Sequence, residues 1–209
     1  MKIIYCGFFK TASRSIGDFI NEVSVYKSYA GRSIDLHSHP THLIVNDGNI
    51  VISNDDMRTS VHNGIVENPR IYEFLQNNND MIARDYPYFG MYKHIHETYE
   101  DSKFIICIRE TESFINSYKN YDAQLWPIVR NKGNNAILGV NGPYDDIYKE
   151  RLRIVYEIHN HKVLEYFKDK PGKLLVLKFE DIGTKKFEQD ILDFIGLENP
   201  NGIIMKCIK

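Results

Sequence analysis

The sequence has few cysteines and no long apolar run. Its 209 residues include three cysteines, Cys6, Cys107 and Cys207, an odd number without CxxC spacing, which argues against a disulfide framework and a cysteine zinc site. No stretch approaches the roughly 20 apolar residues of a membrane span, and the apolar start of the chain is too short for a signal peptide. We therefore expect a cytoplasmic protein with no membrane span.

The chain also lacks an excess of charge of either sign. Its 26 Lys and Arg residues stand against 28 Asp and Glu residues, a formal net charge of −2. Such a balance gives no reason to expect a partner among nucleic acids or anionic membrane surfaces, so any anion site must be local. The length suits one domain with a sizeable core, and we expect a single domain over residues 1–209.

Short apolar runs alternate along the chain with longer helical patterns. The runs lie at 2–7, 81–85, 103–109 and 174–179, and the helical patterns cover 13–27, 88–99, 111–121, 145–168 and 185–195. Strands that alternate with helices predict a parallel sheet with helices on both faces, and the unbroken apolar runs FIICI and LLVL are typical of its central strands. The expected fold is a three-layer α/β/α domain with four or five parallel strands.

Two segments depart from this alternation. In 42–53, "HLIVNDGNIVIS", an Asp-Gly turn separates two β-branched runs, which predicts a small β-hairpin. The stretch 126–143 is rich in Gly and Asn and has no clear period, so we expect a loop over one edge of the site.

The stretch "GFFKTASRSIGDFI", residues 7–20, follows the first apolar run directly, as a strand that turns into a helix. The first N–H groups of a helix lack partners and its dipole favours an anion, so a loop with Lys10 at this junction predicts a phosphate site. The Walker P-loop pattern, which binds ATP, requires a second glycine and a lysine followed by a hydroxyl residue at fixed spacing. Here Lys10 comes only three residues after Gly7, so an ATP site is disfavoured. The alternative is a solvated Lys10 and a Ser13 that only caps the helix.

This loop resembles the 5′-phosphosulfate loop of sulfotransferases, which use 3′-phosphoadenosine 5′-phosphosulfate (PAPS). Their first strand is followed by a pattern like P-K-[TS]-[GA]-[TS]-[TSR]-[TSA]. Phe9 replaces the usual proline, and Arg14 replaces a hydroxyl, as in the glycosaminoglycan branch of the family. The resemblance implies cofactor binding by Lys10, Thr11, Ala12, Ser13, Arg14 and Ser15.

A second pattern supports the first. In 104–121, Arg109 ends a buried strand and Ser117 follows eight residues later on a helix, the spacing with which sulfotransferases hold the 3′-phosphate of PAPS. A guanidinium can grip a phosphate with two hydrogen bonds and a serine adds a donor. Alone, the pair also fits a surface Arg beside Glu110 or Glu112 and a solvated Ser. Two patterns in the correct order, each at a strand-to-helix junction, favour the family.

The similarity extends over most of 1–30 and 80–198, where further segments resemble a soluble sulfotransferase-like branch. It implies a P-loop NTPase-like sulfotransferase fold with one parallel sheet. Residues 31–79 have no counterpart, so 31–79 and 126–143 are expected to be insertions on the acceptor side.

The general base that takes the proton of the acceptor is less well marked. Asp85 ends a strand at the edge where α/β folds bind ligands, although it could instead cap a helix or pair with Arg84 or Lys10. His37 or His39, in the stretch "LHSHPTH", could serve as the base. These histidines and His42 have no matching carboxylates or cysteines, so no metal site is expected.

The resemblance implies transfer of a sulfuryl group from PAPS to a hydroxyl or amine on a small-molecule, glycan or peptide acceptor. The product would be 3′-phosphoadenosine 5′-phosphate (PAP), and no metal is expected. Lys10 would stabilise charge on the phosphosulfate, while Arg109 and Ser117 would orient the nucleotide. The alternatives are a catalytically silent PAP-binding or PAPS-binding protein, a P-loop kinase and a structural protein. The sequence predicts neither the acceptor nor the oligomeric state.

Overall fold

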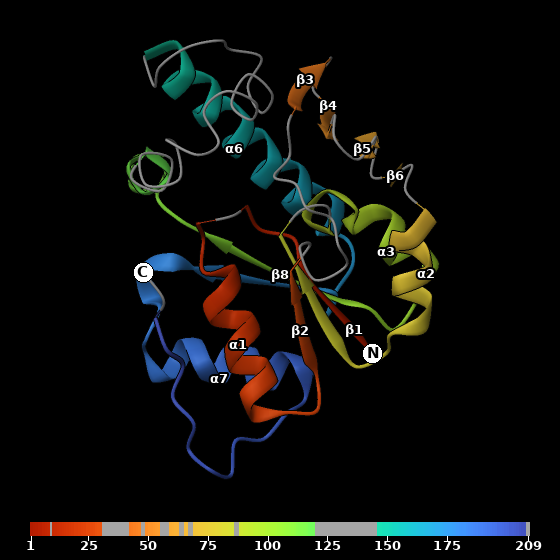
Figure 1. Ribbon diagram of the computed structural model, residues 1–209. Helices are drawn as coiled ribbons and strands as arrows, with labels where there is room; N and C mark the ends of the chain where they lie inside the picture. The colour runs from red at the N-terminus through yellow and green to blue at the C-terminus, as the bar shows by residue number, and fades with distance from the viewer. Residues whose placement is uncertain are drawn as a thin grey trace.

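A five-stranded parallel sheet forms the centre of the molecule (Figure 1). This computed structural model describes residues 1–8, 10–30, 42–46, 49–54, 59–62, 65–66, 69–85, 88–119 and 146–207. The strand order is β2-β7-β1-β8-β9. The strands are β1 (Lys2–Tyr5), β2 (Lys27–Ala30), β7 (Met81–Arg84), β8 (Lys103–Ile108) and β9 (Leu174–Lys178). The predicted parallel sheet of four or five strands is confirmed.

Helices cover both faces of this sheet and make three layers. Along β1, Ile3 and Tyr5 face one apolar core, whereas Ile4 and Cys6 face the other. The first core includes α1 (Ser13–Val23) and α7 (Lys185–Ile195). The second includes α2 (Pro69–Asn77), η2 (Tyr88–Gly90), α3 (Tyr92–Thr98), the helical residues 111–119 and α6 (Asp146–Phe167). Burial on both faces explains the apolar runs of β1 and β8. The expectation that LLVL forms a central strand is wrong, because β9 lies at the edge of the sheet and only its Leu177 is buried.

The first predicted helix is too long in our sequence analysis, because α1 ends at Val23 and not at residue 27. The Ser24 hydroxyl donates to Ile20 O and accepts a hydrogen bond from Tyr26 N at 3.1 Å, which satisfies backbone groups where the helix stops. The chain then enters β2, which pairs in parallel with β7. Every residue of this edge strand is at least partly exposed, so the sequence has no apolar run that predicts the strand.

A second sheet is antiparallel and has four strands among the described residues. They are β3 (His42–Asn46), β4 (Asn49–Asn54), β5 (Thr59–His62) and β6 (Ile65–Val66). The predicted hairpin over 42–53 is confirmed, since β3 pairs with β4 up to Asn46 opposite Asn49. We did not expect β5, β6 or α2. The predicted loop at 126–143 lies outside the described residues.

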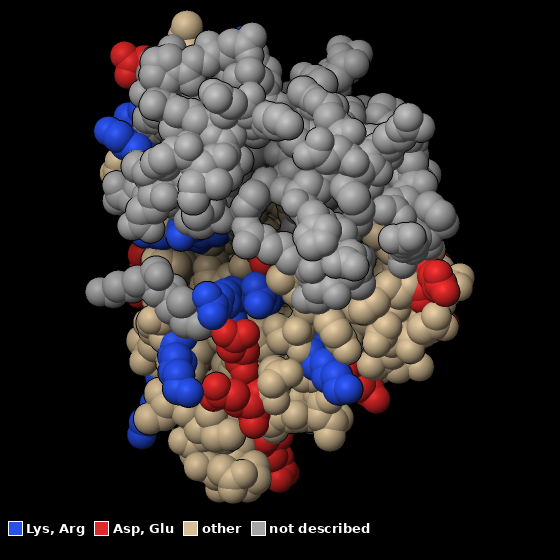
Figure 2. Space-filling model, in the orientation of Figure 1, with Lys and Arg blue, Asp and Glu red and all other residues tan. Residues whose placement is uncertain are grey.

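Charges of both signs are mixed on the surface. In Figure 2, Lys and Arg side chains lie directly beside Asp and Glu side chains over the lower half of the face shown. Ion pairs such as Lys186 with Asp190 at 2.6 Å contribute to this mixing. This mixing agrees with the net charge of −2, so an anion site would have to be a local cluster of positive side chains.

Candidate functional site

The loop between β1 and α1 is fixed to the strand by buried hydrogen bonds. The Tyr5 hydroxyl donates to the backbone oxygen of Thr11, and the Thr11 hydroxyl donates to the backbone oxygen of Phe8. A side chain at Gly7 would place its Cβ 2.8 Å from the Tyr5 hydroxyl, so a glycine is needed for Tyr5 to reach the loop. Thr11 is fully buried, and its hydroxyl also lies 2.7 Å from the Tyr5 hydroxyl.

Two residues of this loop adopt backbone angles that side chains disfavour. Lys10 has φ 65° and Ala12 has φ 73°, both in the left-handed region. Such strain costs free energy and is typical of functional sites. Ala12 is the N-cap of α1 and makes no side-chain capping bond, so the first amides of the helix are not capped by its side chain. Ser15 is buried, whereas Arg14 is largely exposed and pairs with Asp18 at 3.5 Å.

Arg109, directly after β8, reaches across to this loop. Its Nη1 donates a hydrogen bond to the backbone oxygen of Lys10 at 3.2 Å, and its Nε donates to Ser113 Oγ at 2.9 Å. The guanidinium lies 4.0 Å from the ring centroid of Phe179, a cation–π contact. The hydroxyl of Tyr156 accepts from Arg109 N at 2.8 Å and donates to Arg109 O at 2.7 Å. These contacts fix both the backbone and the side chain of Arg109.

The positive charge of Arg109 is close enough to act on Lys10. Burial, together with the charge of Arg109, lowers the pKa of Lys10 below its ordinary value. Burial also lowers the pKa of Arg109, while the carboxylates of Glu180 and Glu110 oppose this shift. Because like charges held together favour a counter-ion, an anion between these two side chains would relieve both effects. The two sequence patterns therefore meet in one cationic cluster.

Ser117 belongs to the helical residues 111–119 and is partly buried. It follows Ser113 by one helical turn, so the two hydroxyls lie on the same face of that helix. Since Ser113 accepts a hydrogen bond from Arg109, Ser117 lies on the Arg109 side of the helix. Ser113, Tyr156 and Phe179 were not predicted, because only the fold brings them to Arg109.

Asp85, directly after β7, lies against the start of α1. Its Oδ1 accepts a hydrogen bond from Ser13 Oγ at 2.7 Å, and its Oδ2 accepts one from Arg84 Nη1 at 2.9 Å. Its backbone has φ 65°, a third left-handed residue near the loop. The pairing with Arg84 that the sequence allowed is present. His37 and His39 lie outside the described residues.

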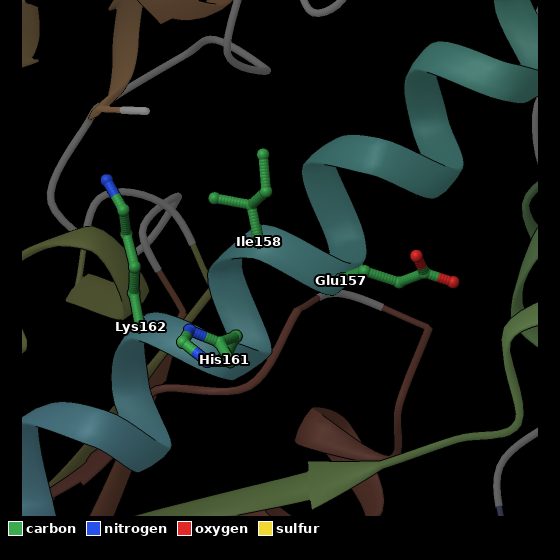
Figure 3. Close-up of a pocket in the computed structure, with 4 residues that line it drawn as sticks. All are labelled: Glu157, Ile158, His161 and Lys162. Carbon is green, nitrogen blue, oxygen red and sulfur yellow. The ribbon is translucent and has the colours of Figure 1, made fainter. Parts of the chain in front are cut away.

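A shallow pocket of about 420 Å³ lies along α6 (Figure 3). It is lined by Glu157, Ile158, His161 and Lys162, and Ile158 and Lys162 project from the same side of the helix. The neighbouring His159 is buried and contacts the backbone oxygen of Cys6 through Nε2 at 2.7 Å, so α6 lies against the end of β1. Burial lowers the pKa of His159 to about 4, which keeps its ring neutral near pH 7.

Comparisons with known proteins agree with this geometry. The sequence profile described as the sulfotransferase domain matches residues 2–203. The chain belongs to the sulfotransferase domain family. The predicted family is thus confirmed, and membership of it supports the predicted transferase activity. A search of curated proteins finds no match to this sulfotransferase.

Two solved structures are similar to this sulfotransferase. The crystal structure of a sulfotransferase from Alicyclobacillus acidocaldarius aligns with 98% of this chain and 83% of its own, with a TM-score of 0.57 and 12% identity. The sulfotransferase domain from the curacin biosynthetic pathway aligns with 62% of this chain and 44% of its own, with a TM-score of 0.44 and 16% identity. The first likeness confirms the predicted sulfotransferase fold.

In the part of the chain that the structure describes, no group of three or more His, Cys, Asp or Glu side chains is placed to hold a metal ion. No helix among those same residues combines the length and the apolar character needed to cross a membrane.

Proposed function

We propose that this sulfotransferase moves a sulfuryl group from PAPS to a hydroxyl or amine acceptor and releases PAP. The observation that carries the proposal is the hydrogen bond from Arg109 to the backbone of Lys10. It joins the two patterns that resemble the nucleotide site of the family. A dianionic phosphate suits the resulting cluster, because both side chains have a pKa lowered by burial and would gain from a counter-ion.

Each residue of the cluster has a separate task in this proposal. Lys10 and the amides at the start of α1 stabilise negative charge at the 5′ end of the nucleotide. Arg109 and Ser117 hold the 3′-phosphate, with the Arg109 side chain already oriented by Ser113 and Phe179. Fixed donors of this kind do not have to reorganise when charge develops.

The transfer is a single displacement at sulfur. The acceptor oxygen or nitrogen forms a bond to sulfur while the bond from sulfur to the bridging oxygen breaks, and the electron pair stays on the phosphate of PAP. The acceptor proton goes to a base, for which we propose Asp85, with His37 as the alternative. In support, Asp85 follows a strand at the carboxyl edge of the sheet, next to Ser13.

One observation favours a second candidate, a silent protein that binds PAP or PAPS. Each carboxylate oxygen of Asp85 already accepts a hydrogen bond, one from Ser13 and one from Arg84. An acceptor hydroxyl or amine would have to compete with these two donors for the carboxylate. Such a protein would bind the nucleotide through Lys10 and Arg109 and transfer nothing.

Nucleotide binding and transfer are tested in two steps. PAP should raise the melting temperature, whereas 5′-AMP, which lacks the 3′-phosphate, should do far less. Arg109→Ala should nearly remove this difference, because a hydrogen bond to a charged group contributes about 1.5–3 kcal/mol. Arg153→Ala, which removes an arginine paired with Glu112 and Glu150, is the matched control. Equal shifts with both nucleotides would refute the assignment.

The second step uses PAPS with a labelled sulfur and pools of alcohols, phenols, amines and sugars. Transfer of label to any acceptor, with PAP as co-product, supports the enzyme. Binding of PAP without transfer to any pool supports the silent protein.

A further inference from the structure

Arg84, the last residue of β7, connects three elements beside the candidate site. Its Nε donates to Ser28 Oγ of β2 at 3.2 Å, and its Nη1 donates to Asp85 Oδ2 at 2.9 Å. Its Nη2 lies 3.8 Å from Asp18 Oδ1 of α1. The side chain is only 13% exposed, so these contacts are partly shielded from water. The sequence alone indicated no role for Arg84 beyond that of a partner for Asp85.

The path of this side chain depends on a glycine in α1. A Cβ at Gly17 would lie 2.9 Å from Cδ and Nε of Arg84 and 2.7 Å from Ser28 Oγ, closer than real contacts allow. Glycine in the middle of a helix is destabilising by roughly 0.5–1 kcal/mol relative to alanine. Here the missing side chain leaves the space in which Arg84 crosses α1 toward Asp85.

Asp85 creates an electrostatic conflict that Arg84 can resolve. Its carboxylate lies 2.7 Å from Ser13 Oγ, at the first residue of α1, where an anionic ligand is expected. A second negative charge at that point would repel the ligand, and repulsion between charges is strong where water is partly excluded. The guanidinium of Arg84 contacts the other carboxylate oxygen. Its charge offsets that of Asp85, and its hydrogen bond holds the carboxylate in place.

We propose that Arg84 is a positioning residue of the sulfotransferase site, which holds Asp85 against Ser13 and offsets its charge so that the donor nucleotide can bind at the start of α1. This inference rests on the proposed function, because it requires an anionic nucleotide there. The competing explanation is a structural brace between β7, β2 and α1. A brace would matter for folding, but its effect on nucleotide binding would not depend on the charge of Asp85.

A double-mutant cycle on PAP binding separates these two roles. Calorimetry would compare wild type, Arg84→Gln, Asp85→Asn and the double variant, with circular dichroism to check folding. We expect Arg84→Gln to weaken PAP binding roughly tenfold or more, because it leaves the carboxylate of Asp85 without its positively charged partner. Adding Asp85→Asn should restore affinity to within about threefold of the Asp85→Asn single variant, because the repelling charge is gone. Arg153→Gln, a paired arginine elsewhere on the surface, is the control.

The outcomes distinguish the inference from the proposed function. Wild type that fails to bind PAP overturns both. Wild type that binds PAP, with Arg84→Gln binding equally well or with the double variant as weak as Arg84→Gln, overturns only the role of Arg84. If Arg84→Gln does not fold, Arg84→Met, which keeps most of the apolar stem of the side chain but removes its charge, takes its place in the cycle. A loss that Asp85→Asn reverses then supports the inference, and any other result overturns it.

Discussion

The guanidinium of Arg109 donates a hydrogen bond to the backbone oxygen of Lys10 at 3.2 Å, although 99 positions separate the two residues. They follow β8 and β1, which are neighbours in the sheet. Parallel neighbours end at the same edge, and this is where open α/β sheets bind ligands. The fold thus brings two distant strand-to-helix junctions into one cationic site.

The first prediction concerns Lys10, which we propose stabilises charge as the bond between sulfur and the bridging oxygen breaks. Its effect should therefore fall on rate more than on binding. Lys10→Ala should lower kcat by roughly a hundredfold or more, the scale for loss of one preorganised donor, while PAP affinity changes modestly. Steady-state kinetics and calorimetry would measure the two effects.

A matched control for Lys10 is Lys186→Ala on α7, whose side chain is 82% exposed and paired with Asp190. This variant should keep wild-type kcat. An unchanged kcat in Lys10→Ala, with chemistry shown to be rate-limiting, would mean that Lys10 is only a solvated side chain with no role in the transfer.

The second prediction concerns Asp85 as the base. Asp85→Asn is nearly isosteric and should keep the fold and PAP binding, yet lower kcat by roughly 10²–10⁴ and remove the acid limb of the pH profile of kcat. The measurement is kcat as a function of pH, from about pH 5 to about pH 9. Full activity in this variant, with a comparable loss in His37→Ala, would move the base to the histidine.

The sequence predicts the parts of this molecule that local patterns encode. The strand before Lys10 and the strand before Arg109 are buried on both faces and, after an initial lysine, carry an apolar run, so both junctions could be located. In contrast, every residue of β2 is at least partly exposed, and the strand carries no such signal. The contact of Arg84 with Ser28 depends on that unpredicted strand. The role of Arg84 could only be inferred once the fold had placed β2 beside β7.

The third prediction concerns pH and stability. In the unfolded chain the pKa of His159 is near 6.5, whereas burial lowers the pKa to about 4 in the folded protein. Between these values the unfolded state binds a proton that the folded state does not, so the free energy of unfolding should fall as pH decreases from 6.5 to 4. The loss is at most about 3–4 kcal/mol, from about 1.4 kcal/mol per pKa unit.

Urea unfolding at several pH values would measure this slope. His159→Gln keeps a donor for Cys6 O and cannot titrate, so it should flatten the slope in this range. His161→Gln, at an exposed position on the same helix, is the control. The same slope in wild type and His159→Gln would show that other groups cause the pH dependence.

The last prediction concerns Gly17, where an alanine should lower the free energy of unfolding although alanine usually stabilises a helix. Within a helix, glycine to alanine stabilises by roughly 0.5–1 kcal/mol. At this position the new Cβ would meet Ser28 Oγ at 2.7 Å and Arg84 Nε at 2.9 Å. We expect Gly17→Ala to lower the free energy of unfolding by about 1–3 kcal/mol, the usual cost of overpacking, and to weaken PAP binding by displacing Arg84.

Removing the side chains of Ser28 and Arg84 should reverse the effect of Gly17→Ala on the free energy of unfolding. In a Ser28→Ala, Arg84→Ala background the space is open, so Gly17→Ala should be neutral or should stabilise, as in an ordinary helix. Urea unfolding of the four variants measures the coupling directly. Stabilisation by Gly17→Ala in the wild-type background would mean that the Arg84 side chain can move away from α1 with little loss of stability. Because its contact with Asp85 depends on that path, the same result would also argue against Arg84 as a positioning residue.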